Sequence, residues 1–171
     1  MKELINARLR GKKELHRIMI ANGQFVSIDE QHDYLNLPEH EGVFDAQGKL
    51  ACAPFVEPHI HLDAALTAGE PNWNNSGTLF EGIERWGERK PMLNEADIRS
   101  RVYQTLEMLV ENGVQHVRTH ADTTDPSLIG VRTLCAIRDE LKDKINIQVV
   151  AFPQDGLLSY EGGLELMIEA L

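Results

Sequence analysis

The feature that most constrains the fold of this chain is a regular alternation of strand-like and helix-like segments from Pro54 onward. Short apolar runs, each the length of a buried strand, alternate with longer segments in which apolar residues recur at helical spacing. We expect strands over 55–61, 114–120 and 145–152, and helices over 79–90, 94–112, 125–141 and from about 163. This order favours a parallel sheet with helices packed on it. The predicted class is therefore α/β.

The helix after residue 93 has the clearest predicted ends. Asn94 can cap its N-terminus, because its side chain can accept a hydrogen bond from a free backbone N–H of the first turn. Ile98, Val102 and Leu106 lie on one helical face, and Gly113 supplies the stop. In the next helix, Asp125 is expected to cap and the proline after it to take the first helical position.

The first fifty residues have a different pattern, which indicates β structure. Residues 14–21 and 24–28 read as two strands joined at Asn22-Gly23, a strong hairpin turn. A polar stretch follows over 29–41, and then another short strand with a turn over 42–50. These strands are too few to form a stable sandwich alone. We therefore predict two regions: 1–53 as part of an incomplete β-sandwich, and 54–171 as the α/β region.

Composition narrows the possible partners. The 171 residues are 42% hydrophobic and 26% charged, as in ordinary globular proteins, and the net charge of −10 argues against nucleic acid. No stretch approaches the ~20 apolar residues that span a bilayer, and the first residues lack the apolar segment of a signal peptide. Cys52 and Cys135 form no C-x-x-C pattern and are expected to be free thiols. We expect a cytoplasmic protein without nucleic-acid or membrane partners.

His59 and His61, at the end of the first predicted strand of the α/β region, are candidate metal ligands. Residues i and i+2 of a strand face the same side, so both imidazoles can converge on one cation. Imidazole suits zinc, iron and similar divalent metals. A His-x-His pair alone is weak evidence, because two histidines on a polar strand face would give the same pattern.

Polar residues also gather at the ends of the later predicted strands, where parallel α/β barrels carry their catalytic groups. Strand parity places Arg118, His120 and Asp122 on one side, and Gln154 follows the third strand. His120 and Asp122 could instead form a satisfied polar pair inside the barrel, and Gln154 could cap a turn. Asp63 could orient a ligand histidine or simply begin a loop.

A long loop over 62–78, rich in Gly, Pro, Asn and Trp, follows the first of these strands. Loops of this length are uncommon unless they are functional. Trp73 and Trp86 could be ordinary packing aromatics, and the helical spacing of Trp86 favours that interpretation.

The chain resembles the amidohydrolase superfamily, and within it the bacterial, barrel-type cytosine deaminases. The first metal strand of the superfamily is similar to Phe55-Val-Glu-Pro-His-Ile-His-Leu-Asp63. The closer resemblance rests on Ala68–Lys90 with its Asn-Trp-Asn-Asn-Ser-Gly-Thr-Leu-Phe-Glu-Gly segment, on His116-Val-Arg-Thr-His-Ala-Asp122, and on Gln148-Val-Val-Ala-Phe-Pro-Gln154. It extends over nearly the whole chain and is densest from Pro54 to Lys90.

This resemblance implies a fold, a cofactor and a set of site residues. Residues 54–171 would form the first three βα units of a (β/α)8 TIM-type barrel holding one divalent metal, iron or zinc. His59 and His61 would bind the metal, Gln154 would hydrogen-bond the pyrimidine ring, and the loop around Leu79 would cover the substrate. His120, Asp122 and Asp63 would line the barrel interior near the ligands.

The reaction implied for the complete enzyme is hydrolytic deamination of cytosine, or a related cyclic amidine, to uracil and ammonia. Further metal ligands and the proton-shuttling glutamate of the family lie on later strands, and such a barrel needs roughly 250 residues. We therefore expect this chain to be the N-terminal portion of an enzyme, inactive alone, and the full-length enzyme to be a homo-oligomer.

Alternatives remain open from the sequence. Another amidohydrolase could act on a creatinine-like or triazine ring, or a dihydroorotase-like enzyme could use two metals. The chain could also be a non-catalytic binding or assembly fragment of a split barrel.

Overall fold

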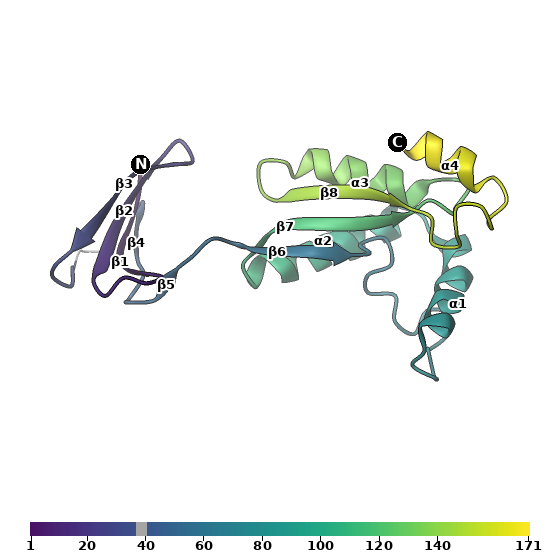
Figure 1. Ribbon diagram of the computed structural model, residues 1–171, viewed down its shortest axis with the longest axis horizontal. Coiled ribbons are helices and arrows are strands. Elements are labelled where there is room, and N and C mark those ends of the chain that lie inside the picture. Colours follow the sequence, from purple (N-terminus) through teal and green to yellow (C-terminus); the bar gives the residue numbers. More distant parts are fainter. Residues whose placement is uncertain (37–40) are drawn as a thin grey trace. The chain divides into compact units, whose positions relative to one another are not determined.

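The computed structural model describes residues 1–36 and 41–171, so part of the polar stretch predicted over 29–41 lies outside the described residues. Contacts divide the chain into two compact units, Met1–Ala53 and Pro54–Leu171, and each is described by itself below. Figure 1 labels their strands and helices. No helix in the described ranges is both long and apolar enough to span a bilayer.

The first unit is a five-stranded sheet. Its strands are β1 (Lys2–Leu9), β2 (Leu15–Ala21), β3 (Gln24–Gln31), β4 (Val43–Asp45) and β5 (Leu50–Ala51). β1 pairs antiparallel with β2 and β2 with β3, while β4 and β5 both pair parallel with β1. The predicted hairpin at Asn22-Gly23 is confirmed, with positive φ at both residues. β3 continues three residues beyond the predicted Ile28.

Strand β1 was not predicted, although it pairs with three other strands of this sheet. The reason lies at Asn6, which has a φ of 55° and lies within the register shift between Leu4 and Ala7. The shift breaks the two-residue alternation, so Ile5, Asn6 and Ala7 are all buried. Asn6 is satisfied there, since its amide donates to Asp45 Oδ1 at 2.8 Å.

The second unit combines a three-stranded parallel sheet with helices. The sheet order is β6–β7–β8, formed by β6 (Phe55–Ile60), β7 (Val114–Asp122) and β8 (Asn146–Phe152). The helices are α1 (Leu79–Arg89), the short 3-10 helix η1 (Lys90–Met92), α2 (Glu95–Glu111), α3 (Ile129–Glu140) and α4 (Gly163–Ala170). The predicted mixed α/β class and the alternation of strand and helix are confirmed.

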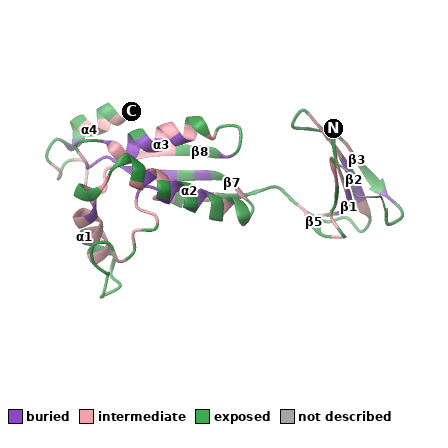
Figure 2. Ribbon diagram, turned by 180° about the vertical axis from the view of Figure 1, so that it is seen from behind, coloured by how far each residue is buried: buried purple, intermediate pink, exposed green. Residues whose placement is uncertain are grey.

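Helices α2 and α3 cover one face of this sheet, and the buried residues lie between the two layers (Figure 2). Val117, Thr119 and Ala121 of β7 point into this core and are at most 3% exposed. His116 and Arg118 lie on the opposite, open face. The predicted parity of β7 is therefore confirmed as far as Ala121, because the helices bury one set of alternate residues and not the other. Asp122, the last residue of the strand, is buried as well.

The helix ends follow the predictions in one case and depart from them in another. Asn94 Oδ1 accepts a hydrogen bond from Asp97 N at 3.0 Å, and Gly113 has a φ of 81° just beyond α2. The prediction that Asp125 caps the next helix is wrong, because α3 begins only at Ile129. The Asp125 carboxylate instead accepts hydrogen bonds from the main-chain and side-chain groups of Ser127 and from Ile129 N, which holds a turn before the helix.

Candidate active site

A cavity of about 540 Å³ lies where the C-terminal ends of the parallel strands meet helix α1. Five residues singled out from the sequence line it: His61, Asp63, Leu79, Asp122 and Gln154. They come from the segment just after β6, the start of α1, the end of β7 and the segment after β8, so distant parts of the sequence converge on one space. A volume of this size suits a small ring compound.

Three histidines and a phenylalanine form an aromatic cluster beside this cavity. The ring centroids of His59 and His61 are 5.3 Å apart, and His120 stacks on His59 at 4.0 Å. Phe152, the last residue of β8, lies 5.2 Å from His61. His59 and His61 are brought together by the strand spacing, as predicted, whereas only the pairing of β6 with β7 brings His120 to them.

The surroundings of His61 and His120 favour neutral imidazoles. Burial lowers the pKa of His61, and the neighbouring His59 lowers it further. Burial and His59 likewise lower the pKa of His120. Neutral imidazole is the form that binds metals, so these groups are in the ligand-competent state at neutral pH.

The histidine pair fits part of a metal site. Two imidazoles that bind one ion at about 2.1 Å with a near-tetrahedral angle have ring centroids on the order of 5 Å apart, which matches the 5.3 Å between His59 and His61. In the described ranges, however, no group of three His, Cys, Asp or Glu side chains is arranged to hold a metal. Catalytic sites usually use three protein ligands, so the two imidazoles correspond in number and spacing to part of such a set.

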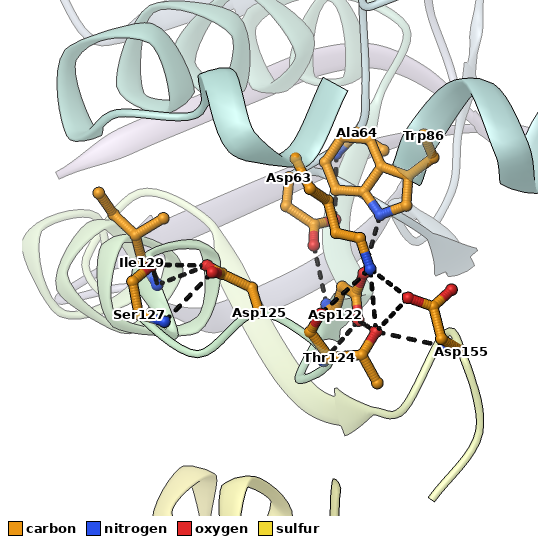
Figure 3. A network of polar contacts seen from close by, with 10 residues as sticks. Asp63, Ala64, Trp86, Asp122, Thr124, Asp125, Ser127, Ile129 and Asp155 are labelled. Carbon is orange, nitrogen blue, oxygen red and sulfur yellow. Dashed lines mark hydrogen bonds and ion pairs between the residues drawn. The ribbon is translucent and has the colours of Figure 1, made fainter. Parts of the chain in front are cut away.

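Asp122 ends β7 and is the centre of a hydrogen-bond network beside the cavity (Figure 3). Its carboxylate is 4% exposed and accepts hydrogen bonds from Trp86 Nε1 at 2.8 Å and from Thr124 N at 2.7 Å. Lys90 Nζ lies 3.2 Å from the same carboxylate. Asp122 therefore joins the end of β7 to helix α1 and to Lys90, the residue that follows α1.

Trp86 was expected to be a packing aromatic, and the structure assigns it more than that. Its indole lines the cavity, and its N–H is the donor to Asp122. The helical period alone could not distinguish this role, because the partner of the indole is 36 residues away in sequence. Trp73 is 65% exposed and lines a neighbouring cavity of about 270 Å³.

Asp63 is the second buried carboxylate beside the cavity. Its Oδ2 accepts a hydrogen bond from Asp122 N at 2.8 Å, and its Oδ1 accepts one from Ala64 N at 3.1 Å. Burial raises the pKa of Asp63 to about 6 against the opposing effect of the Asp122 N–H. Among residues 1–36 and 41–171, the carboxylate thus contacts main-chain groups rather than an imidazole, and it ties the segment after β6 to the end of β7.

The loop after β6 is held in place by a buried arginine of helix α2. Arg101 of α2 donates to the carbonyl oxygens of Asp63 at 2.8 Å and Ala65 at 2.7 Å. Its guanidinium also pairs with Asp97 at 2.9 Å, and Arg89 pairs with the same carboxylate at 2.8 Å. This arginine could not be identified from the sequence, because nothing in the spacing of α2 shows which carbonyls it reaches.

The start of α1, which forms one wall of the cavity, is held by its own cap. Thr78 Oγ1 accepts a hydrogen bond from Glu81 N at 3.3 Å, and the Glu81 carboxylate accepts one from Ser76 N at 2.7 Å. This arrangement is a variant of the capping box, in which Glu81 reaches the N–H of Ser76 while the N–H of the N-cap Thr78 donates to Ser76 Oγ. It places Leu79, which is 75% exposed, at the edge of the cavity.

Comparison with known proteins shows the family. The model of the amidohydrolase family matches residues 42–169, so the chain belongs to that family. N-isopropylammelide isopropyl amidohydrolase of Pseudomonas sp. (strain ADP) is 31% identical over 156 residues, which are 88% of this chain and 38% of that protein.

Among solved structures, the chain is similar to 5-methylcytosine deaminase from Klebsiella pneumoniae, both liganded with 5-fluorocytosine and liganded with phosphonocytosine. Each comparison gives 52% identity and a TM-score of 0.91, and covers 98% of this chain and 40% of that chain. The resemblance to cytosine deaminases expected from the sequence is confirmed. N-isopropylammelide isopropylaminohydrolase from Burkholderia multivorans, with a TM-score of 0.73 at 24% identity over 99% of this chain and 42% of that one, shows the same fold. This chain spans about two fifths of the length of these relatives.

Proposed function

We propose that this chain forms part of the active site of a metal-dependent hydrolase that deaminates cytosine or a closely related pyrimidine. The observation that carries the proposal is the convergence of His61, Asp63, Leu79, Asp122 and Gln154 on one cavity. The similarity to 5-methylcytosine deaminase supports this class of substrate. In a complete site, the remaining metal ligands and the proton shuttle would come from the region that corresponds to the part of the relatives not matched by this chain.

The chain's own residues have distinct tasks in this proposal. His59 and His61 hold one divalent metal, iron or zinc, which when bound activates water for hydrolysis. Gln154 orients the ring, because a carboxamide offers a donor and an acceptor in one plane and can pair with an N–H/C=O edge. Leu79 closes the cavity from α1, and Asp122 with Asp63 keeps the strand ends at fixed separation. The β6–β8 sheet corresponds in this proposal to the first three βα units of the barrel.

The proposal is tested on the full-length protein with two variants that should fail differently. His61→Ala should lose most of the bound metal and all measurable ammonia release. Gln154→Ala should keep its metal, while kcat/KM falls by on the order of 10²-fold, since ring orientation alone is lost. His32→Ala is the matched control, because the His32 side chain is 84% exposed in the first unit. Normal metal content in His61→Ala, or unchanged kinetics in Gln154→Ala, would contradict these assignments.

One competing substrate class has specific support. The 31% identity to an enzyme named for N-isopropylammelide, a triazine, keeps substituted triazine rings as a candidate. Ammonia and alkylamine release should therefore be measured on cytosine, 5-methylcytosine and N-isopropylammelide side by side. We expect the pyrimidines to give the higher kcat/KM, and the reverse order would move the proposal to the triazines. Light scattering on the same preparation tests the expected homo-oligomer.

A further inference from the structure

Lys90 lies outside the cavity, directly after the helix that forms one of its walls. It is the first residue of η1, and its side chain is 11% exposed. Its ammonium donates to Thr124 O and to Thr124 Oγ1, both at 3.1 Å. It also lies 3.2 Å from Asp122 Oδ2 and forms a short ion pair with Asp155 Oδ2. One side chain after α1 therefore contacts the segments that follow both β7 and β8.

The charges at this point require a cation. Asp122 is 4% exposed and Asp155 is 31% exposed, so at least one of the two carboxylates has little access to water. A buried carboxylate without a counter-charge is strongly destabilised. Burial alone would lower the pKa of Lys90, but the hydrogen bond that its ammonium donates to Asp155 and the charges of Asp122 and Asp155 raise it above its ordinary value. The ammonium is thus charged at neutral pH.

Two side chains on one helical face contact the carboxylate of Asp122. Trp86 and Lys90 are four residues apart, which places them one above the other on a helix, and both contact Asp122. Figure 3 shows Trp86, Asp122, Thr124 and Asp155 drawn together around this point. The C-terminal end of α1 is therefore attached at two points, while its N-terminal residues Leu79 and Gly82 line the cavity.

The residue before Asp155 is Gln154, the candidate ring-binding residue. Asp155 is held by Lys90, and its backbone N–H also donates to Thr124 Oγ1 at 3.3 Å. Fixing Asp155 fixes the backbone of its neighbour, so the position of Gln154 depends on the same ammonium that anchors α1. Lys90 itself does not line the cavity.

We propose that Lys90 is a positioning residue that locks two walls of the cavity together, the α1 wall and the Gln154 wall. It acts through Asp122 and Asp155 and touches no substrate. Its effect on catalysis rests on the proposed function, whereas its effect on the attachment of α1 does not. The two can therefore be measured separately.

The test uses Lys90→Met in the full-length protein. This substitution removes the charge but keeps a long, unbranched side chain. Lys90→Arg should restore most of the wild-type behaviour, because a guanidinium can reach both carboxylates. Lys144→Met is the matched control, since Lys144 is exposed on the loop before β8. We expect KM for cytosine to rise by on the order of tenfold in Lys90→Met, with a smaller fall in kcat. A purely structural role would lower the active fraction, and hence apparent kcat, and leave KM unchanged.

The second measurement needs no enzymatic activity. In a background in which Trp73 and any tryptophan outside residues 1–171 are changed to Phe, Trp86 is the remaining tryptophan. Its quenching by acrylamide then reports how firmly α1 lies against Asp122. Quenching should increase in Lys90→Met and stay low in Lys90→Arg and Lys144→Met. Asp155→Asn removes one of the ammonium's partners at a more exposed site, so it keeps the test decisive if Lys90→Met does not fold. It should give smaller changes in the same direction.

The outcomes separate the two proposals. If no pyrimidine is deaminated, the proposed function fails, while the quenching of Trp86 still decides the role of Lys90. If cytosine is deaminated but KM and quenching in Lys90→Met, or in Asp155→Asn where the former does not fold, match those of Lys144→Met, the role of Lys90 is overturned and the proposed function stands.

Discussion

The buried guanidinium of Arg101 lies beneath the loop that leaves the histidine strand, and its removal should strongly destabilise the second unit. Arg101 is 7% exposed and holds the carbonyl oxygens of Asp63 and Ala65 together with the carboxylate of Asp97. Arg101→Met keeps much of the aliphatic packing but removes all of these donors. Because Asp63 is 1% exposed, water cannot easily replace the lost hydrogen bond.

The expected loss of stability in Arg101→Met can be estimated from the partners of Arg101. A hydrogen bond to a charged group contributes about 1.5–3 kcal/mol, and breaking a buried ion pair costs about 3–5 kcal/mol. Asp97 keeps its contact with Arg89, which places the whole change within about 3–5 kcal/mol rather than above it. Arg132→Met is the matched control, because the Arg132–Glu169 pair is 64% and 55% exposed. Such exposed pairs contribute about 1 kcal/mol at most.

Urea unfolding of the 171-residue chain, followed by tryptophan fluorescence, measures this difference in the second unit, since both tryptophans of these residues lie in Pro54–Leu171. With a slope of about 2 kcal/mol per M, Arg101→Met should lower the midpoint by about 2 M and Arg132→Met by about 0.5 M or less. A midpoint shift for Arg101→Met no larger than that for Arg132→Met would refute the account of the loop. A changed slope would instead indicate a change in the unfolded or native ensemble.

Two further predictions concern the same unit. Burial alone would raise the pKa of Asp97, but the hydrogen bond and charge of Arg101 and the charge of Arg89 outweigh it and lower the pKa. The stability that this pairing contributes is therefore complete above the pKa of the unfolded state, about 4, and is lost as the pH falls below it. The free energies of unfolding of wild type and Asp97→Asn, measured between pH 7 and pH 2, should become more similar as the pH falls. A difference that stays constant over this range would contradict the lowered pKa of Asp97. Leu134→Ala, at a core position 1% exposed, should cost about 2–5 kcal/mol by urea unfolding, whereas Ile168→Ala, 66% exposed, should change stability by less than about 0.5 kcal/mol.

Much of the second unit could be predicted from local patterns. Helix α2 has its cap at Asn94 and its stop at Gly113 because these features depend on residues within a few positions of one another. The parity of β7 follows in the same way from a two-residue period. The histidine pair was predictable for this reason too, since the spacing of His59 and His61 alone brings their rings to one side of the chain end.

Features that depend on distant partners could not be predicted. The bulge at Asn6 hid strand β1, because it interrupts the alternation by which strands are recognised, and the buried amide there is satisfied by residues far along the chain. The start of α3 was placed too early, because Asp125-Pro126 is typical both of a helix start and of a turn. Only the packing of the chain decides between the two.

The sequence by itself determined the α/β class of the second unit, the strand that ends at the His59–His61 pair, and the family, because each is encoded in short-range spacing or in continuous motifs. The tertiary structure alone decided which side chains share the cavity and how its walls are joined. Trp86, Lys90 and Asp155 meet at Asp122 and Thr124 only after β6, β7 and β8 have aligned. These contacts depend on the pairing of strands far apart in sequence and on the exclusion of water from a charged network. Neither can be predicted from a local sequence pattern.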